Sequence, residues 1–579
     1  MQLVQINTTF NFKFNLNWKI VCLIPLVFWL ETEIAVGQQK KKPAKITGNA
    51  GLYGDFYNMN SDTIGAVAPR RPDALGRLVV NASLNIKDFS LPITLSLPTG
   101  QYGVIVPNLT GKNYKEVIKN PLNRIGIAPK YKWVQVLLGS QIPQYSELSV
   151  GDLAVFGAGI SLTPRKFRLS CFAGTSQLAV EQDSSRNIQG IYSRKIYSAK
   201  IGVGHEDSNH IYLIGSMMMD DTSSLKIKPT SVMPQNGILT SIDFKLRLFK
   251  KAFIKGEIAG SAFTRDGRSK DLPEFSITPP DNIFIPKESS RFDYASVLSM
   301  GWDGKKFGVK VTGRYYGDGF VPMGYPFLQT DRLEVTIDPR FMLFKNKLQF
   351  SGSVGKRVNN ISGIRATTTT QTIGSANLNI QFTDKFSLAT SYSNFGFRNS
   401  VLNDTFKVEM ITQSWSVSPS YSHTTKTGLH NFTLMYAQNV FNDFNTVSGA
   451  LNTNDASNGA FSYMLSMLKN PFSVSTILSY FDNNTSFGRL STKAANLTFG
   501  YKFFKKKLGT TAGLTVAENK INDGSSGFQV LTLVGLKYTL KKKISFAING
   551  SLNVFKYGET RPGISYRENL LRTSLTYKF

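Results

Sequence analysis

The chain has four histidines, which occur as two closely spaced pairs, His205 with His210 and His423 with His430. Two imidazoles held together at a turn could bind a metal ion. Zinc sites, however, need at least three protein ligands, and no third ligand accompanies either pair. We interpret the histidines as solvated residues that flank two turns, and we predict no metal ion and no other cofactor.

No segment carries the pattern of a nucleophilic or phosphate-binding site. The sequence lacks a Gly-x-Ser-x-Gly elbow, a His-Glu-x-x-His motif and a P-loop. Charged residues are so numerous that pairing any two carboxylates would single out nothing. We therefore expect that the protein is not an enzyme.

A further set of charged residues alternates with apolar residues. In 241–247, for example, Ile242, Phe244 and Leu246 are separated by charges. Successive side chains of a strand point to opposite faces, and a Lys or Arg facing lipid at mid-bilayer costs about 2–4 kcal/mol. The apolar face must then contact lipid and the charged face must line a lumen. The predicted lumen-facing charges are Asp243, Lys245, Arg247, Lys255, Glu257, Lys310, Arg314, Glu334 and Asp338.

Two interpretations of these charges remain open, a hydrated channel wall and a salt-bridged network without transport. A turn centred on Lys251 would place Lys245 opposite Glu257 and Arg247 opposite Lys255. Like charges directly opposite each other are destabilising, so the second pair needs water or a third group nearby. This arrangement favours a hydrated interior.

The elements that hold these residues are predicted to be strands. Dyad alternation continues through the chain in segments of about 9–11 residues, the length of a tilted transmembrane strand. About 22 such segments lie between 131 and 579, and 107–130 is a candidate periplasmic or lumenal excursion. The fold class is therefore all-β: a transmembrane antiparallel up-and-down β-barrel of about 20–26 strands. Four weaker strand candidates precede the segments between 131 and 579, and they lie at 46–57, 78–86, 89–97 and 101–106.

The connections alternate between short basic turns and long polar loops. Outer-membrane barrels have short turns in the periplasm and long loops outside, so we predict that the basic turns and both termini are periplasmic. The basic turns are 164–166, 250–251, 305–306, 345–347, 384–385, 505–507 and 541–543, and the long loops are 220–237, 264–290, 394–404, 441–459 and 481–489.

Residues 1–37 have the pattern of a signal peptide. Lys13 and Lys19 precede an apolar run that is too short to span a bilayer as a helix. Small residues, Ala35 and Gly37, then predict cleavage before Gln38. We expect 38–579 to form the barrel.

The C-terminal strand ends with alternating apolar residues, Leu575, Tyr577 and Phe579. This ending resembles the C-terminal assembly signal of bacterial outer-membrane barrels. The resemblance implies that the barrel assembly machinery recognises this strand.

The stretch 124–183 contains RIGIAPKYKWVQVLLG, FGAGISLTPRKFRLSCFAG and AVEQD. This stretch resembles a recurring pattern in large, poorly characterised outer-membrane β-barrel proteins of Bacteroidota. The resemblance implies an integral location in the cell outer membrane, in contact with its lipid and with other outer-membrane proteins as candidate partners. It implies no activity.

The net charge of +29 could indicate nucleic acid as a partner. The basic residues, however, sit in short clusters between alternating runs, so we predict no nucleic-acid binding. Strands begin near Ile46, which leaves no room for the plug domain of an energy-coupled transporter. A secreted protein of tandem sandwiches would show domain repeats, and none is present.

Two functions agree with this sequence. The first is a passive channel with a charged lumen. The alternative is a structural, scaffolding or adhesive barrel subunit of an outer-membrane assembly without transport activity.

Overall fold

The computed structural model describes most of the 579-residue chain, and the statements below refer to that part. The described residues are 44–62, 68–98, 123–272, 284–322, 324–325, 328–401, 406–540, 543–559 and 563–579. Of the predicted features, the signal peptide, the strand candidate 101–106 and most of the turn 541–543 lie outside them.

Almost all regular structure in the described residues is β-strand. The strands are β1 (Lys45–Ser61), β2 (Ala74–Ile86), β3 (Phe89–Pro98), β4 (Arg124–Ile127), β5 (Lys130–Tyr131), β6 (Val134–Gln141), β7 (Val155–Leu162), β8 (Phe167–Gln177), β9 (Ser193–Gly204), β10 (His210–Asp221), β11 (Asn236–Leu248), β12 (Ala252–Thr264), β13 (Ser290–Asp303) and β14 (Phe307–Tyr316). They continue as β15 (Arg332–Leu343), β16 (Leu348–Asn359), β17 (Thr369–Gln381), β18 (Phe386–Asn399), β19 (Glu409–Thr424), β20 (Gly428–Asp443), β21 (Asn454–Met467), β22 (Phe472–Thr485), β23 (Gly488–Phe503), β24 (Leu508–Ile521), β25 (Gly524–Leu540), β26 (Ile544–Tyr557) and β27 (Tyr566–Lys578). Two short helical segments, η1 (Ser184–Arg186) and α4 (Gly449–Asn452), lie in connections.

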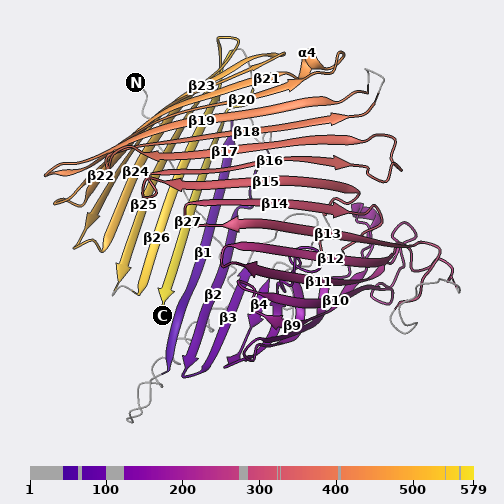
Figure 1. Ribbon diagram of the computed structural model, residues 1–579. Coiled ribbons are helices and arrows are strands. Elements are labelled where there is room, and N and C mark those ends of the chain that lie inside the picture. The colour runs from indigo at the N-terminus through magenta and orange to yellow at the C-terminus, as the bar shows by residue number, and fades with distance from the viewer. Residues whose placement is uncertain are drawn as a thin grey trace, which may run out of the picture.

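The strands form one closed antiparallel barrel. Apart from β4 and β5, consecutive strands pair with each other, and β27 pairs with β1, as Figure 1 shows where the last strand lies beside the first. The short strands β4 and β5 share one place between β3 and β6, so the barrel has 26 positions. The predicted fold class is therefore confirmed.

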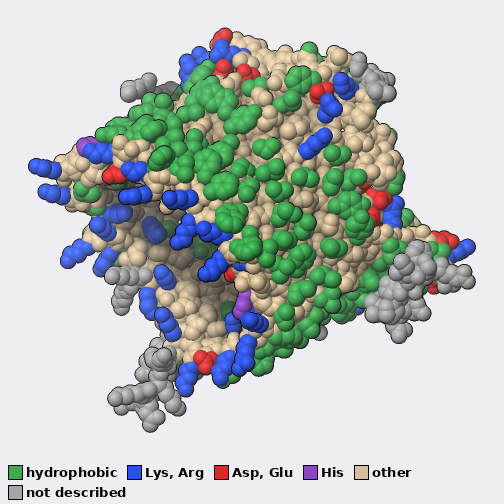
Figure 2. All heavy atoms as spheres, in the orientation of Figure 1, with side chains coloured by type: hydrophobic (Ala, Val, Ile, Leu, Met, Phe, Trp, Pro, Cys, Tyr) green, Lys and Arg blue, Asp and Glu red, His purple; other side chains and the backbone are tan. Residues whose placement is uncertain are grey.

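The outer surface of the barrel is apolar. Ile258 is 58% exposed on this surface, whereas its neighbour Glu257 is only 3% exposed. Figure 2 shows hydrophobic side chains spread over the visible outer face. A closed barrel satisfies every strand hydrogen bond internally, and an apolar outer band needs lipid. The chain is thus an integral outer-membrane β-barrel. Among the described residues, no helix has the length and apolarity needed to cross a membrane.

The described basic turns lie at one rim of the barrel, which we call the basic rim. The described start of β1 and the C-terminal Phe579 lie at the same rim, where the Phe579 amide donates to the Gly48 carbonyl (3.1 Å). The longer connections lie at the opposite rim, which we call the loop rim. Leu575, Tyr577 and Phe579 alternate along the last strand, and Leu575 is exposed on the outer face.

Several strands are longer than the predicted length. β1 and β25 each have 17 residues, because polar strand ends continue pairing beyond the hydrocarbon. For this reason the segment 481–489, which we expected to be a long loop, belongs mainly to β22 and β23. Within the candidate excursion 107–130, the described residues from 124 onward form β4 and the start of β5.

The first prediction concerns the orientation of the barrel in the membrane. The variant Cys171→Ser removes the free cysteine of the described residues and provides the background. On intact cells, a thiol reagent too large to pass through the barrel should label Val447→Cys in the loop after β20, and should fail to label Lys506→Cys at the basic rim. Both sites should react after cell lysis. Labelling of Lys506→Cys but not Val447→Cys on intact cells would invert the orientation.

Candidate functional site: the charged side of the lumen

Two connections from the loop rim fold into the lumen. They are 142–154, between β6 and β7, and the described residues of 317–331, between β14 and β15, and we call them the inner loops. Leu148 and Phe320 are fully buried and pack together on inward side chains of β11 to β14. Val150 forms a parallel bridge with Gly324, which joins the two loops. The inner loops therefore cover one side of the lumen.

Glu257 of β12 holds the first inner loop against the barrel wall. One carboxylate oxygen accepts from the Ser146 hydroxyl (2.6 Å), and the other accepts from the Leu148 amide (3.0 Å). The Tyr325 hydroxyl donates to the Ser146 carbonyl (2.7 Å). Burial raises the pKa of Tyr325 to about 12, helped by nearby carboxylates, so this hydroxyl stays a donor at neutral pH. A carboxylate of the wall thus fixes the position of the loop.

His210 at the start of β10 has acceptors on both sides of its ring. Nδ1 lies 3.2 Å from the His205 carbonyl, and Nε2 lies 3.2 Å from the Asp243 carboxylate. Carbonyl and carboxylate oxygens only accept, so a ring nitrogen that carries a proton donates to the oxygen beside it. The side chain is only 4% exposed, so the interpretation of His210 as a solvated turn residue is wrong.

The two histidine pairs have different surroundings. His205 Nδ1 lies 2.6 Å from the Arg168 guanidinium, from which it accepts a hydrogen bond. His423 and His430 lie opposite each other on β19 and β20, and His430 contacts the Tyr463 hydroxyl (3.0 Å). In the part of the chain that the structure describes, no three His, Cys, Asp or Glu residues are grouped to hold a metal ion.

Lys200 of β9 is a further cation beneath the first inner loop. Its Nζ donates to Glu206 (3.0 Å) and to the Tyr145 carbonyl (3.1 Å), and it lies 4.4 Å from the centroid of the Tyr212 ring. Its side chain is nearly fully buried. This lysine connects the loop, the wall and the turn at the basic rim.

The charges on β14 to β16 form ion pairs across neighbouring strands. Arg314 donates to Glu334 (3.2 Å) and to Glu147 of the first inner loop (3.1 Å). Glu334 also accepts from Arg357 (2.6 Å). Nearer the basic rim, Lys310 lies 3.1 Å from the Asp338 carboxylate. This part of the lumen agrees with the salt-bridged interpretation.

The structure places all nine predicted charges on the inner face, but it corrects the predicted pairing between β11 and β12. Asp243 lies opposite Glu257 and Lys245 opposite Lys255, while Arg247 faces Phe253. The turn is centred on Lys250, one residue earlier than assumed. Moving the centre of a turn by one residue shifts every cross-strand partner by two, which keeps each side chain on its face.

The inward side chains of β19 are polar without being charged. Trp415 and Tyr421 of β19 are exposed on the outer surface, so alternation turns Ser414, Ser416 and Ser420 inward. Ser416 contacts the Ser391 hydroxyl (2.7 Å), and Ser420 contacts that of Thr433 (3.3 Å). We call β9 to β16 the charged side of the lumen and the wall around β19 the hydroxyl-lined side.

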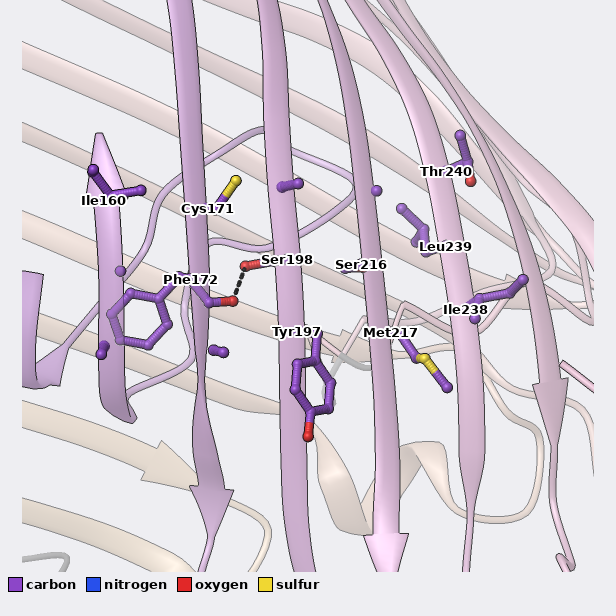
Figure 3. A pocket seen from close by; sticks show the side chains of 15 residues that line it. Ile160, Cys171, Phe172, Tyr197, Ser198, Ser216, Met217, Ile238, Leu239 and Thr240 are labelled. Carbon is purple, nitrogen blue, oxygen red and sulfur yellow. Dashed lines mark hydrogen bonds between the residues drawn. The ribbon is translucent and has the colours of Figure 1, made fainter. Parts of the chain in front are cut away.

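A shallow groove of ≈790 Å³ crosses the outer surface of β7 to β11. Figure 3 shows Ile160, Tyr197, Met217 and Ile238 around it, on neighbouring strands. The Ser198 hydroxyl donates to the Phe172 carbonyl (3.4 Å) and offers little to a polar ligand. The groove faces lipid, so acyl chains can fill it, and it is separate from the lumenal site.

Sequence reasoning missed the residues that enter the site from connections. Ser146, Glu147 and Tyr325 come from the inner loops, and Lys200 and Glu206 were not singled out. Only the inner loops have a usable signal: 142–154 breaks the alternation, and 317–331 is rich in Gly, Pro and aromatic residues. Neither pattern says that the loop folds inward.

No protein-family model matches the chain, and no curated protein matches it. Solved structures with similar folds are large outer-membrane barrels. The translocation pore of the P pilus usher PapC aligns over 92% of this chain and 100% of its own, at 10% identity and a TM-score of 0.38. OccAB4 of Acinetobacter baumannii aligns over 72% of this chain and 97% of its own, at 13% identity and a TM-score of 0.29. The FrpB iron transporter of Neisseria meningitidis aligns over 95% of this chain and 83% of its own, at 10% identity and a TM-score of 0.36. Likeness at this level says nothing about the ligand of this chain.

The second prediction tests the attachment of the first inner loop. Glu257→Gln removes the negative charge that both hydrogen bonds share and replaces one accepting oxygen by an NH₂ donor, so the bond from the Leu148 amide is weakened in either orientation of the side-chain amide. A hydrogen bond to a charged group contributes about 1.5–3 kcal/mol. Amide hydrogen exchange of Leu148 should therefore accelerate by about tenfold or more.

Asp338→Asn is the matched control, because its carboxylate contacts Lys310 and Ser353 and no inner loop. It should leave the exchange rate of Leu148 unchanged. Equal rates in the wild type and in Glu257→Gln would show that Glu257 does not hold the loop.

Proposed function

We propose that this barrel is a passive channel through the outer membrane, without enzymatic activity. One observation carries the proposal. The inner loops pack on β8 to β14, whereas the inward serines of β19 are only half-buried and no described segment packs on them. A barrel of this circumference has room for water unless something fills it. Polar, uncovered hydroxyls are the surface that water would contact.

The charged side of the lumen supports the same function. Lys245 and Lys255 lie directly opposite each other on adjacent strands. Neither has a carboxylate within ion-pair distance in the described part of the chain. Like charges in this geometry are destabilising unless water or counter-ions screen them. A water-filled lumen provides this screening.

The third prediction concerns conduction. The purified full-length protein in planar bilayers should give steady ionic currents. Ser416→Asp places a negative charge on the hydroxyl-lined side, so the reversal potential in a KCl gradient should shift toward cation selectivity. Val447→Asp adds the same charge at an exposed site outside the lumen and should change the potential much less.

Absence of current in the folded wild type would contradict the channel. The structural or scaffolding role would then account better for the ion-paired wall. Equal shifts in the two Asp variants would show that the current does not pass along β19.

A further inference from the structure

We propose that the lumen binds a small oxyanion, a phosphate or carboxylate group, in a cationic pocket at the basic rim. The pocket has a volume of ≈170 Å³. The residues that line it are Lys245, Arg247, Lys250, Lys251, Phe253, Lys255 and Asp303. The role of this pocket in transport rests on the proposed channel. The pocket identifies small oxyanions as the class of solute. Binding itself can be measured without conduction.

The charge of the pocket is strongly unbalanced. Five cations line it, against one carboxylate, that of Asp303. Asp303 is already ion-paired with Arg340 of β15. Within the described residues, none of the five cations has a carboxylate within 4.0 Å. The pocket therefore offers several cations to a ligand and almost no anion of its own.

The backbone holds the cations together. Lys245 and Lys255 are direct cross-strand partners, and Arg247 follows two residues along the same face. The Arg247 amide donates to the Asn209 side chain (2.8 Å), which ties the end of β11 to the neighbouring turn. The repulsion between opposed lysines is thus built into the register. A bound anion would remove it.

The chemistry of these side chains fits an oxyanion. A guanidinium presents paired N–H groups that match two oxygens of a phosphate or carboxylate, and lysine ammonium groups add point charges. The volume suits a single small group rather than an extended polymer. Figure 2 shows a hollow in the molecule surrounded by Lys and Arg side chains.

Carboxylates line the wall next to the pocket, on the side away from the basic rim. Lys245 and Lys255 also line a second cavity of ≈340 Å³, together with Glu147, Asp152 and Asp243. An anion moving inward from the basic rim would reach the opposed lysines and then meet these negative charges. Of these two cavities, the pocket at the basic rim has the larger excess of cations over carboxylates.

The test is a titration of the full-length protein with phosphate, in detergent at low ionic strength, in which binding is measured by calorimetry. Lys245→Gln with Lys255→Gln should weaken phosphate binding at least tenfold. The double variant removes a repulsive pair, so the barrel should still fold, which its circular dichroism would verify. Lys505→Gln with Lys506→Gln removes two cations at another turn of the same rim. This control should bind phosphate within twofold of the wild type.

Competition between acetate and phosphate distinguishes a site for any small oxyanion from a site that is specific for phosphate. Competition by acetate would support a general oxyanion site, and phosphate binding without acetate competition would restrict the class to phosphates. Binding that is undetectable in the wild type, or is weakened equally in both double variants, would overturn the proposal. Phosphate binding without bilayer current would leave the site standing and reject the channel, and current without phosphate binding would do the reverse.

Discussion

Backbone hydrogen bonding in lipid is the constraint on which the rest of this structure depends. Unpaired amide and carbonyl groups in hydrocarbon cost several kcal/mol each, so a sheet can span a bilayer only when it closes. Pairing of β27 with β1 provides the closure. Alternation then follows along every strand, with residues such as Ile258 on the lipid side and Glu257 on the lumenal side. The charges inside the barrel are a consequence of the same constraint that keeps its outer surface apolar.

The lumen is divided by what covers its wall. Around β11 to β14 the inner loops bring Leu148 and Phe320 onto apolar inward residues, and Glu257 fixes the first loop with two hydrogen bonds. Ion pairs of Arg314 and Arg357 with Glu334 stabilise the neighbouring strands. On β19 the inward residues are serines that no described segment covers. The charged side is therefore shaped by fixed contacts, whereas the described residues leave the hydroxyl-lined side uncovered.

The fold could be predicted from the sequence because a period of two is a local property of each segment. Ile242 and Asp243 indicate their faces without any knowledge of their neighbours. Cross-strand register is less local. We expected the turn to be centred on Lys251, which would pair Lys245 with Glu257, whereas the turn is centred on Lys250 and pairs Lys245 with Lys255. The polar end of β22 shows the same limit, because strand pairing continues beyond the hydrocarbon where alternation no longer marks it.

The candidate site was less predictable, because it depends on contacts between distant segments. Ser146 meets Glu257 across more than a hundred residues, and Tyr325 reaches Ser146 from the second inner loop. No spacing in the sequence encodes these encounters. His210 illustrates the consequence: its position beside a turn suggested solvation, whereas the fold buries it against Asp243.

The central claim is that the uncovered side of the lumen is hydrated. Its most direct test is the reaction rate of an impermeant thiol reagent with single cysteines along β19, in the membrane-embedded Cys171→Ser protein. The account predicts that Ser414→Cys, Ser416→Cys and Ser418→Cys react rapidly, while Trp415→Cys and Val417→Cys between them do not. Slow reaction at all five positions, or reaction without alternation, would contradict it.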